Sequence, residues 1–294
     1  MPPRLPPLVC PVCRNTLSPL PADTAANPRI RALVCSDGHS FDAAKQGYFN
    51  LLVGKGTSFE ADTPDMVAAR TAFLDAGHYR PLAEAVAAAA APALQGADPA
   101  VLDSGTGTGH YLRAILDLPR ADAPPAAVGL DISKFALRRA ARLNPEAVNM
   151  VCDIWQPLPV ADASMDVVTV VFAPRNAAEF SRVLRPGGRL VVVTPRPGHL
   201  QDIASQAGML GIEPAKEERL AESLAGHFEL LGAEDLDLDL ELSPVDVANV
   251  ALMGPAGHHT DRAALDVRLS GLPAATLVAA RFRISVFLPR QPVA

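Results

Sequence analysis

The chain has 294 residues, of which 49% are hydrophobic and 20% are charged, as is typical of a soluble globular protein. This length allows one large domain together with a small one. No apolar run approaches the ~18 residues of a membrane span, and the proline-rich N-terminus lacks the apolar core of a signal peptide. The sequence therefore predicts a cytoplasmic protein that has no membrane partner.

The net charge of −6 is distributed unevenly along the chain. Residues 1–58 contain six basic and three acidic side chains and therefore carry a charge of +3. The rest of the chain, with 20 basic and 29 acidic side chains, carries −9. A basic segment attached to an acidic domain suits contact with a phosphate backbone, and chance variation in surface charge is the alternative.

Three of the four cysteines lie in this basic segment. Cys10 and Cys13 form a C-x-x-C element, and Cys35 and His39 form a C-x-x-x-H element. Two turns with this spacing direct three sulfurs and one imidazole at a single point, as a structural zinc site requires. A redox pair is the alternative, but a redox C-x-x-C is expected at a helix start beside a βαβ unit. We therefore predict a zinc-binding module in residues 1–58.

A linker and a helix are predicted after this module. Residues 53–63 read as a linker, and Thr63 followed by Pro64 signals a helix start, since threonine caps the first turn and proline fits its first position. Apolar residues then recur at helical spacing until Gly-His-Tyr at 77–79 interrupts them. We place a second, larger domain in residues 59–294.

Residues 101–109, V-L-D-S-G-T-G-T-G, are the segment around which the larger domain is organised. An apolar strand ends at Asp103, and a helical pattern starts directly after the last glycine. Glycines allow the backbone to approach a ligand closely, and the first turn of a helix offers free N–H groups to it. Taken alone, the glycines also fit an ordinary strand–helix turn or a dinucleotide-binding loop.

The segments that follow are predicted strands. Residues 127–131 and 148–153 each end in an acid, and residues 165–171 and 189–193 form two further apolar runs. Asp131 follows the glycines by ~20 residues, which is the place of an acid that binds ribose hydroxyls.

Two segments near the C-terminus alternate between apolar and polar residues. Residues 235–242 and 277–288 have the period of two that marks a half-buried strand. Between them the pattern predicts two short helices, near 243–253 and 261–271. These strands would form the antiparallel end of the sheet.

The order of these elements resembles the class I S-adenosylmethionine (SAM) methyltransferases. The L-R-P-G-G-R-L run at 184–190 is one of the more specific marks of that family. A nicotinamide-binding Rossmann domain is the alternative, but its G-x-G-x-x-G pattern does not fit the loop at 105–109. The resemblance implies an α/β, Rossmann-like fold with a seven-stranded sheet, attached to the small zinc-binding module.

Residues 41–52, F-D-A-A-K-Q-G-Y-F-N-L-L, narrow the resemblance. Together with the cysteine elements, with residues 73–82 and with F-A-P-R-N at 172–176, they are similar to the 23S ribosomal RNA guanine-N1 methyltransferases. Residues 61–70 look closest to the branch that includes the tylosin-resistance methyltransferase of macrolide producers. The resemblance implies SAM and Zn²⁺ as cofactors, 23S rRNA as the substrate and a homodimer as the assembly.

Two other functions are weighed against this one. The first is SAM-dependent methylation of a small molecule in antibiotic biosynthesis, although such enzymes usually lack an N-terminal zinc module. The second is a non-catalytic nucleic-acid-binding protein with a vestigial methyltransferase fold, which the intact glycines and strand-end acids disfavour. Methylation of a guanine in a 23S rRNA hairpin loop near the macrolide site, with resistance to tylosin-type macrolides, is the favoured prediction.

The expected SAM-binding residues are mostly at strand ends, where a parallel sheet binds its ligands. They are Tyr79, Asp103, Gly105, Gly107, Thr108, Gly109, Asp131, Asp153, Ile154 and His199. Asp131 is assigned to the ribose, Asp153 to the adenine amino group and Ile154 to the ring, whereas Tyr79 and His199 are implied by the resemblance alone. Arg175 and Asn176 are predicted to contact the target guanine.

Overall fold

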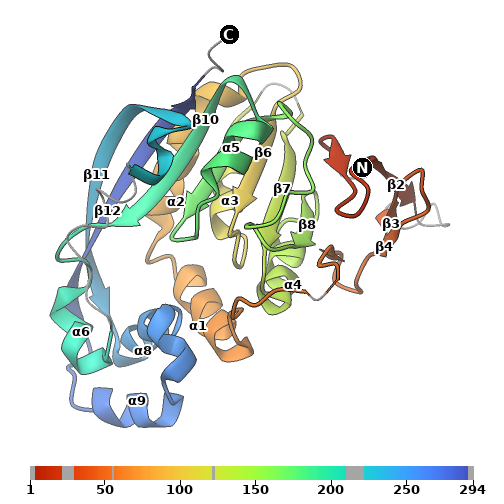
Figure 1. Cartoon of the computed structure of the whole chain (residues 1–294). Helices are drawn as coiled ribbons and strands as arrows, with labels where there is room; N and C mark the ends of the chain where they lie inside the picture. The colour runs from red at the N-terminus through yellow and green to blue at the C-terminus, as the bar shows by residue number, and fades with distance from the viewer. Residues whose placement is uncertain (1–3, 22–29, 55, 121–122, 210–221, 291–294) are drawn as a thin grey trace.

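The structure of the protein is a computed structural model that describes residues 4–21, 30–54, 56–120, 123–209 and 222–290. Figure 1 shows a central twisted sheet with helices on both faces and a small separate sheet beside one edge. Within the described ranges, no helix combines the length and the apolar character that a membrane crossing needs.

The central sheet has eight strands in the order β11-β12-β10-β9-β6-β7-β8-β5. In chain order its strands are β5 (Phe49–Asn50), β6 (Ala100–Ser104), β7 (Ala126–Asp131), β8 (Val148–Val151), β9 (Met165–Val171), β10 (Leu184–Pro195), β11 (Phe228–Leu242) and β12 (Thr276–Pro289). The strands from β5 to β10 pair in parallel, and β12 is antiparallel to both β10 and β11.

The predicted count of seven strands was wrong by one. The seven expected strands are present, and the two residues of β5 add an eighth at the edge of β8. β5 belongs to the N-terminal segment, and its pairing covers backbone groups of β8 that an open sheet edge would expose. A two-residue strand has no periodicity of its own, so the sequence pattern could not predict it.

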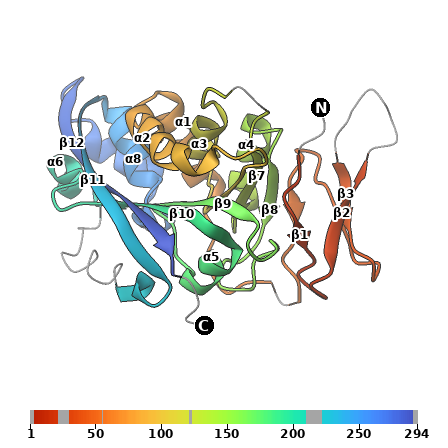
Figure 2. The same ribbon diagram turned by 90° about the horizontal axis from the view of Figure 1, so that it is seen from above.

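Helices cover both faces of the sheet because its inner strands are apolar throughout. The strands β6 and β8 are buried along their whole length, as in sheets that are packed on both faces. Helices α2 (Arg80–Ala90), α3 (His110–Leu116) and α4 (Lys134–Leu143) lie on one side, and α5 (Ala177–Val183) lies on the other (Figure 2). Short turns of 3₁₀ helix, η1 (Ala91–Leu94) and η2 (Pro255–His259), follow α2 and α8 (Pro244–Leu252).

A group of helices lies at the carboxyl edge of the parallel strands (Figure 1). It consists of α1 (Pro64–Asp75), α6 (Gln201–Ala207), α8 (Pro244–Leu252) and α9 (Arg262–Leu269). The predicted start of α1 is confirmed, because the Thr63 hydroxyl oxygen accepts a hydrogen bond from the Met66 N–H at 3.3 Å. Both short helices predicted between the last two strands are also present as α8 and α9.

The N-terminal segment forms a four-stranded antiparallel sheet beside β8 (Figure 2). Its strands are β1 (Leu8–Val9), β2 (Thr16–Pro21), β3 (Ile30–Val34) and β4 (Ser40–Asp42). The Val9 N–H donates to the carbonyl of Pro159 at 3.1 Å, and Arg14 Nη1 donates to the carbonyl of Leu158 at 2.9 Å. Apolar residues of this sheet, such as Leu33, join the same core cluster as residues of β6 and β7. The predicted division at residue 58 falls between β5 and α1.

Candidate metal centre and cofactor site

The four predicted zinc ligands meet at one point of the small sheet. The ligand atoms of Cys10, Cys13, Cys35 and His39 all lie within 4.8 Å of one another. Cys13 Sγ is 3.6 Å from Cys35 Sγ, close to the ~3.7 Å that two sulfurs at zinc–sulfur distances of ~2.3 Å span in a tetrahedral site.

Hydrogen bonds within the protein favour the thiolate form of Cys35. Burial raises the pKa of Cys35, but hydrogen bonds from His39 and from nearby backbone N–H groups outweigh it and lower the pKa to about 7. Cys35 Sγ lies 3.4 Å from Nδ1 of His39. Because a thiolate is the form that binds zinc, these donors favour the binding form of Cys35, whereas burial and a hydrogen bond to Cys35 raise the pKa of the neighbouring Cys13.

The glycine-rich loop runs from the end of β6 to the start of α3. Gly105 has φ +77°, and a Cβ there would lie 2.3 Å from the Cβ of Ala173. Gly109 has φ +87°, and its Cβ would lie 2.5 Å from Nδ2 of Asn144. Only glycine satisfies the backbone angle and the close packing at both positions. The N–H groups of Gly105 and Thr106 both donate to the carbonyl of Leu130 at 2.8 Å, which ties the loop to the end of β7.

Asp131, at the end of β7, is held by the loop that it faces. Its Oδ2 accepts the Gly107 N–H at 2.8 Å, and its Oδ1 accepts the Ser133 N–H at 2.7 Å. Burial raises the pKa of the Asp131 carboxyl. Asp131 therefore fixes the shape of the loop before any ligand binds.

Asp153, beyond the end of β8, is also bonded by the chain. Its Oδ2 accepts the Thr57 hydroxyl at 3.0 Å, and its Oδ1 accepts the Trp155 N–H at 3.0 Å. The neighbouring Ile154 is buried, and its carbonyl accepts Nδ2 of Asn176 at 2.8 Å. Asp131 and Asp153 thus lie at the ends of adjacent parallel strands.

Asp103, at the end of β6, contrasts with these two acids. Its side chain is buried and its Oδ1 accepts the Thr169 hydroxyl at 2.7 Å, but Oδ2 has no hydrogen-bond partner among the described residues. Burial raises the pKa of Asp103 to about 6, and the hydroxyls of Thr169 and Thr106 offset only part of this effect. A buried carboxylate oxygen without a partner is a site for a cationic or hydrogen-bond-donating ligand group.

Tyr79 and His199 come together in one aromatic cluster. Tyr79 is buried, and its ring meets Phe282 edge-on with centroids 5.0 Å apart and lies 6.5 Å from the ring of His199. The Tyr79 hydroxyl has no hydrogen-bond partner within the described ranges. His199 Nδ1 accepts the Arg281 N–H at 3.1 Å, and burial lowers the pKa of His199 to about 4. The imidazole is therefore neutral at pH 7, with Nε2–H left as a donor.

Arg175 and Asn176 follow β9, as predicted, but they differ in their surroundings. Asn176 caps α5, where its Oδ1 accepts the Glu179 N–H at 3.4 Å while its Nδ2 bonds to Ile154. Arg175 is half-buried, burial lowers its pKa, and the described part of the chain gives it no ion pair or hydrogen bond. The same segment contains Phe172, which has φ +55° and is 45% exposed. A positive φ in a bulky residue marks backbone strain.

Sequence reasoning missed three residues of this site. The segment 57–62, read as a plain linker, crosses the ends of β7 and β8, because Thr57 bonds Asp153 and the carbonyl of Asp62 accepts the Ser133 hydroxyl at 2.9 Å. Asp62 also pairs with Arg70 at 2.5 Å. A Cβ at Gly107 would lie 3.4 Å from the Arg70 guanidinium, so Arg70 contacts the glycine loop. No local pattern links these residues to the strand ends.

Buried polar atoms that have no hydrogen-bond partner in the described residues show whether the carboxyl edge of the sheet fits SAM. Asp103 and Tyr79 bury polar atoms that a ligand with an ammonium group and hydroxyls would satisfy, and the glycines leave the backbone open to close approach. A glycine-rich loop after β6 and acids after β6, β7 and β8 lie at the edge where a parallel sheet binds its ligands, and this arrangement fits the class I SAM-dependent methyltransferases that the sequence resembles. The predicted α/β Rossmann-like fold with a zinc module is confirmed.

Comparison with known proteins supports both parts of the chain. Residues 101–188 match the family described as "Methyltransferase domain", and residues 8–55 match the zinc ribbon described as "RlmA, N-terminal". The methyltransferase domain implies SAM as cofactor, and the ribbon together with the Cys₃His cluster supports Zn²⁺.

Three related proteins are similar to this chain over about two thirds or more of its length. A protein of Micromonospora griseorubida assigned as a 23S rRNA (guanine-N(1)-)-methyltransferase is 46% identical, over 97% of this chain and 98% of the relative. The 23S rRNA (guanine(748)-N(1))-methyltransferase of Streptomyces fradiae is 47% identical, over 83% and 86%. A protein of Bacillus subtilis (strain 168) with the same assignment as the first is 31% identical, over 66% of each chain. The chain belongs to the 23S rRNA (guanine-N1)-methyltransferase family.

Proposed function

We propose that the protein transfers a methyl group from SAM to N1 of a guanine in a 23S rRNA hairpin loop near the macrolide site, at a position of the guanine-748 type. The observation that carries the proposal is the combination, in one chain, of a Cys₃His ribbon and a methyltransferase sheet over almost the whole length of the first relative. A small-molecule methyltransferase would not need the ribbon, so the match across it favours RNA.

In this proposal the carboxyl edge of the sheet holds SAM. Gly105, Gly107, Thr108 and Gly109 admit the cofactor to the backbone of the loop, Asp131 accepts from the ribose, Asp153 accepts from the adenine amino group and Ile154 covers the ring. Asp103 receives the ammonium group of the methionine part, and its unpartnered oxygen supports that role. Tyr79 and His199 form the aromatic wall beside it. The neutral state of His199 avoids repulsion of a cationic cofactor.

The chemistry asks the protein mainly to position its substrates. SAM supplies an activated methyl group, so the chain has to align the acceptor and exclude water. As the methyl passes from the sulfur of SAM to N1 and S-adenosylhomocysteine leaves, the N1 proton of guanine must pass to a base or to water, and hydrogen bonds to O6 would stabilise the charge that develops there. Arg175 suits this role because its guanidinium is half-buried and has no counter-ion within the described residues.

Asn176 is proposed to hold the segment after β9, which contains Arg175, in place. Its bonds to Ile154 and to the Glu179 N–H join the end of β8 to the start of α5. We propose that it holds the segment at the guanine and contributes less to RNA affinity than to the rate. Asn176→Ala should therefore lower kcat more than it changes RNA affinity.

The test is methyl transfer to a 23S rRNA hairpin. N1 methylation blocks Watson–Crick pairing, so reverse transcription should stop at the modified guanine when the protein and SAM are both present. A hairpin with adenine at that position is the matched control. If SAM binds but no stop appears at any guanine, the proposal is wrong; methylation of small molecules in the same assay would favour the alternative.

The biological setting is proposed on the same basis. A protein that modifies rRNA would act in the cytoplasm, and methylation near the macrolide site would confer resistance to tylosin-type macrolides. We also propose a homodimer in which two ribbons flank one RNA. Light scattering of the purified protein tests the assembly, and expression in a macrolide-sensitive host tests the resistance.

A further inference from the structure

Helix α4 has a charge pattern that the cofactor site does not explain. It contains Lys134, Arg138, Arg139 and Arg142, and no acid occurs between residues 132 and 145. Within the described ranges none of the four forms an ion pair, whereas Arg113 pairs with Asp117 and Glu146. Such a concentration of unpaired cations is unexpected in a chain whose net charge is −6.

Three of the four cations form a single row. Lys134, Arg138 and Arg142 are four residues apart, and the helical rise of 1.5 Å per residue places successive members ~6 Å apart along one face. Like charges at this spacing destabilise a helix, so the row lowers the stability of the protein when no anion is bound to it. That separation is comparable with the distance between successive phosphates of an RNA strand.

The row is also partly ordered in advance. Lys134 Nζ and the Arg138 guanidinium lie over the ring of Phe135, at 5.3 Å and 5.2 Å from its centroid. Arg138 Nε is buried and has no hydrogen-bond partner among the described residues. A cation held over an aromatic ring loses less conformational freedom when it binds an anion.

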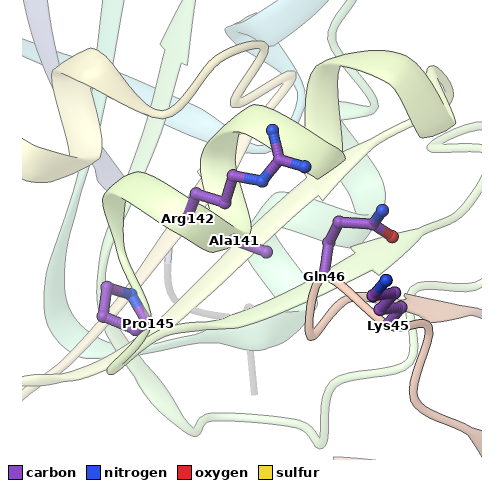
Figure 3. A pocket seen from close by; sticks show the side chains of 5 residues that line it. All are labelled: Lys45, Gln46, Ala141, Arg142 and Pro145. Carbon is purple, nitrogen blue, oxygen red and sulfur yellow. The ribbon is translucent and has the colours of Figure 1, made fainter.

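The N-terminal segment adds a cation at the far end of the row. The turn before β5 and the end of α4 border an open surface pocket of about 450 Å³, with Lys45 and Gln46 on one side and Ala141, Arg142 and Pro145 on the other (Figure 3). Lys45 and Arg142 are both exposed. Arg139 is exposed too, and it lies beside Arg142 on the helix surface because the two are three residues apart. We call Lys45, Lys134, Arg138, Arg139 and Arg142 the basic track.

The basic track begins at the cofactor edge. Ser133 caps α4, and it lies two residues after Asp131 at the end of β7. From there α4 runs back along the sheet toward the turn at Lys45. A strand bound along the track would therefore have one end at the carboxyl edge, where the target base must enter.

We infer that the basic track binds the phosphate backbone of the RNA stem next to the modified loop. This inference rests on the proposed function and adds to it a phosphate-binding surface outside the zinc ribbon. An anionic membrane is a less suitable partner, because an interfacial helix needs an exposed apolar face and the apolar residues of α4, such as Leu137 and Ala140, are buried. The groove between the turn before β5 and α4 can also hold an RNA strand better than it can contact a flat membrane surface.

The experiment compares the triple variant Lys45→Gln/Arg139→Gln/Arg142→Gln with wild type on one rRNA hairpin. The slope of log K against log salt should become less steep by about one for each lost phosphate contact. KM for RNA should rise on the order of tenfold, with kcat and the Kd for SAM within about twofold, because the three substituted residues lie away from the end of the track that meets the cofactor edge.

Three controls make the result decisive. Arg268→Gln, an exposed arginine on α9, has the same type of charge loss and should leave the slope unchanged. Lys45→Arg/Arg139→Lys/Arg142→Lys keeps the charge and should restore most of the affinity. Wild type should not bind phosphatidylserine vesicles.

The outcomes separate this inference from the proposed function. A triple variant with wild-type SAM affinity, salt slope and KM would overturn the basic track while leaving the rRNA methyltransferase intact. Vesicle binding that the triple substitution abolishes, with RNA binding unchanged, would assign the track to a membrane instead. A wild-type protein that binds SAM but methylates no guanine would remove the proposed function itself.

Discussion

The zinc site and the cofactor site are built in opposite ways. The zinc ligands lie within residues 10–39 on two tight turns, and their four ligand atoms point at one another. The candidate cofactor site collects residues between 57 and 199, mostly at strand ends, and all three of its acids already accept hydrogen bonds from the chain. A site whose ligand atoms converge depends on its metal for order, whereas a site whose groups have chain partners keeps its shape without its ligand.

Loss of one ligand residue should therefore change the free energy of folding more at the zinc site than at the cofactor site. Structural zinc binding in small peptides contributes about 10–16 kcal/mol to their folding. A single hydrogen bond to a charged group contributes only about 1.5–3 kcal/mol. Loss of one zinc ligand should therefore disturb the structure, and loss of one cofactor ligand should mainly disturb affinity.

The largest effect is expected from Cys13→Ser. Zinc content should fall from about one equivalent per chain to well below one, and trypsin should cut the N-terminal segment faster, because the metal no longer holds the two turns together. Metal analysis and limited proteolysis measure these changes. Cys152→Ser is the matched control, since Cys152 is buried in the core of the larger domain and should leave zinc in place. Equal zinc in both variants would contradict the ligand set.

Asp131→Ala tests the opposite kind of site. Calorimetry should show SAM affinity reduced on the order of tenfold or more, because the change removes the proposed ribose partner and the acceptor that fixes Gly107. The thermal midpoint of the unliganded protein should fall far less than that of Cys13→Ser. Asp266→Ala, which removes an exposed acid of α9, is the control for charge loss. Unchanged SAM affinity would place the cofactor elsewhere.

The pH dependence of SAM affinity should report on Asp103. Its pKa of about 6 in the unliganded protein means that the carboxyl is largely protonated at pH 5 and ionised at pH 7. A cationic ligand favours the carboxylate, so SAM affinity should rise with pH across this window, by at most tenfold per unit. Ionising this buried acid destabilises the unliganded fold between pH 3.8 and about 6, so the ligand effect has the opposite sign. Asp103→Asn should flatten the affinity profile, and an equally steep profile in that variant would exclude Asp103 as its origin.

The smallest effect is expected from Thr57→Val. The substitution keeps the shape of the side chain and removes one donor to the Asp153 carboxylate, a bond that contributes about 1.5–3 kcal/mol but acts on SAM only through the position of Asp153. SAM affinity should change several-fold at most, with the fold intact. Ser58→Ala, at the neighbouring exposed position, is the control. A loss as large as that of Asp131→Ala would show that the segment 57–62 is a principal cofactor element.

Local sequence determined the features of this protein that depend on neighbouring residues. The zinc ligands follow from the spacing of two turns, because four ligand atoms on short loops can converge only in one way. The glycine loop and the acids after β6, β7 and β8 follow from apolar runs that end in a polar residue. Parallel strands align their carboxyl ends, so this pattern alone placed Asp103, Asp131 and Asp153 at one edge.

Only the tertiary structure decided which residues from distant segments complete these sites. The two residues of β5 became an eighth strand because β8 had an open edge, and Thr57, Asp62 and Arg70 reached the cofactor edge through contacts with residues far away in sequence. Lys45 joined the cations of α4 in the same way. Periodicity reports which face of an element is buried, but it contains no information on which distant segment packs against that face. That choice is made by the packing of the whole chain.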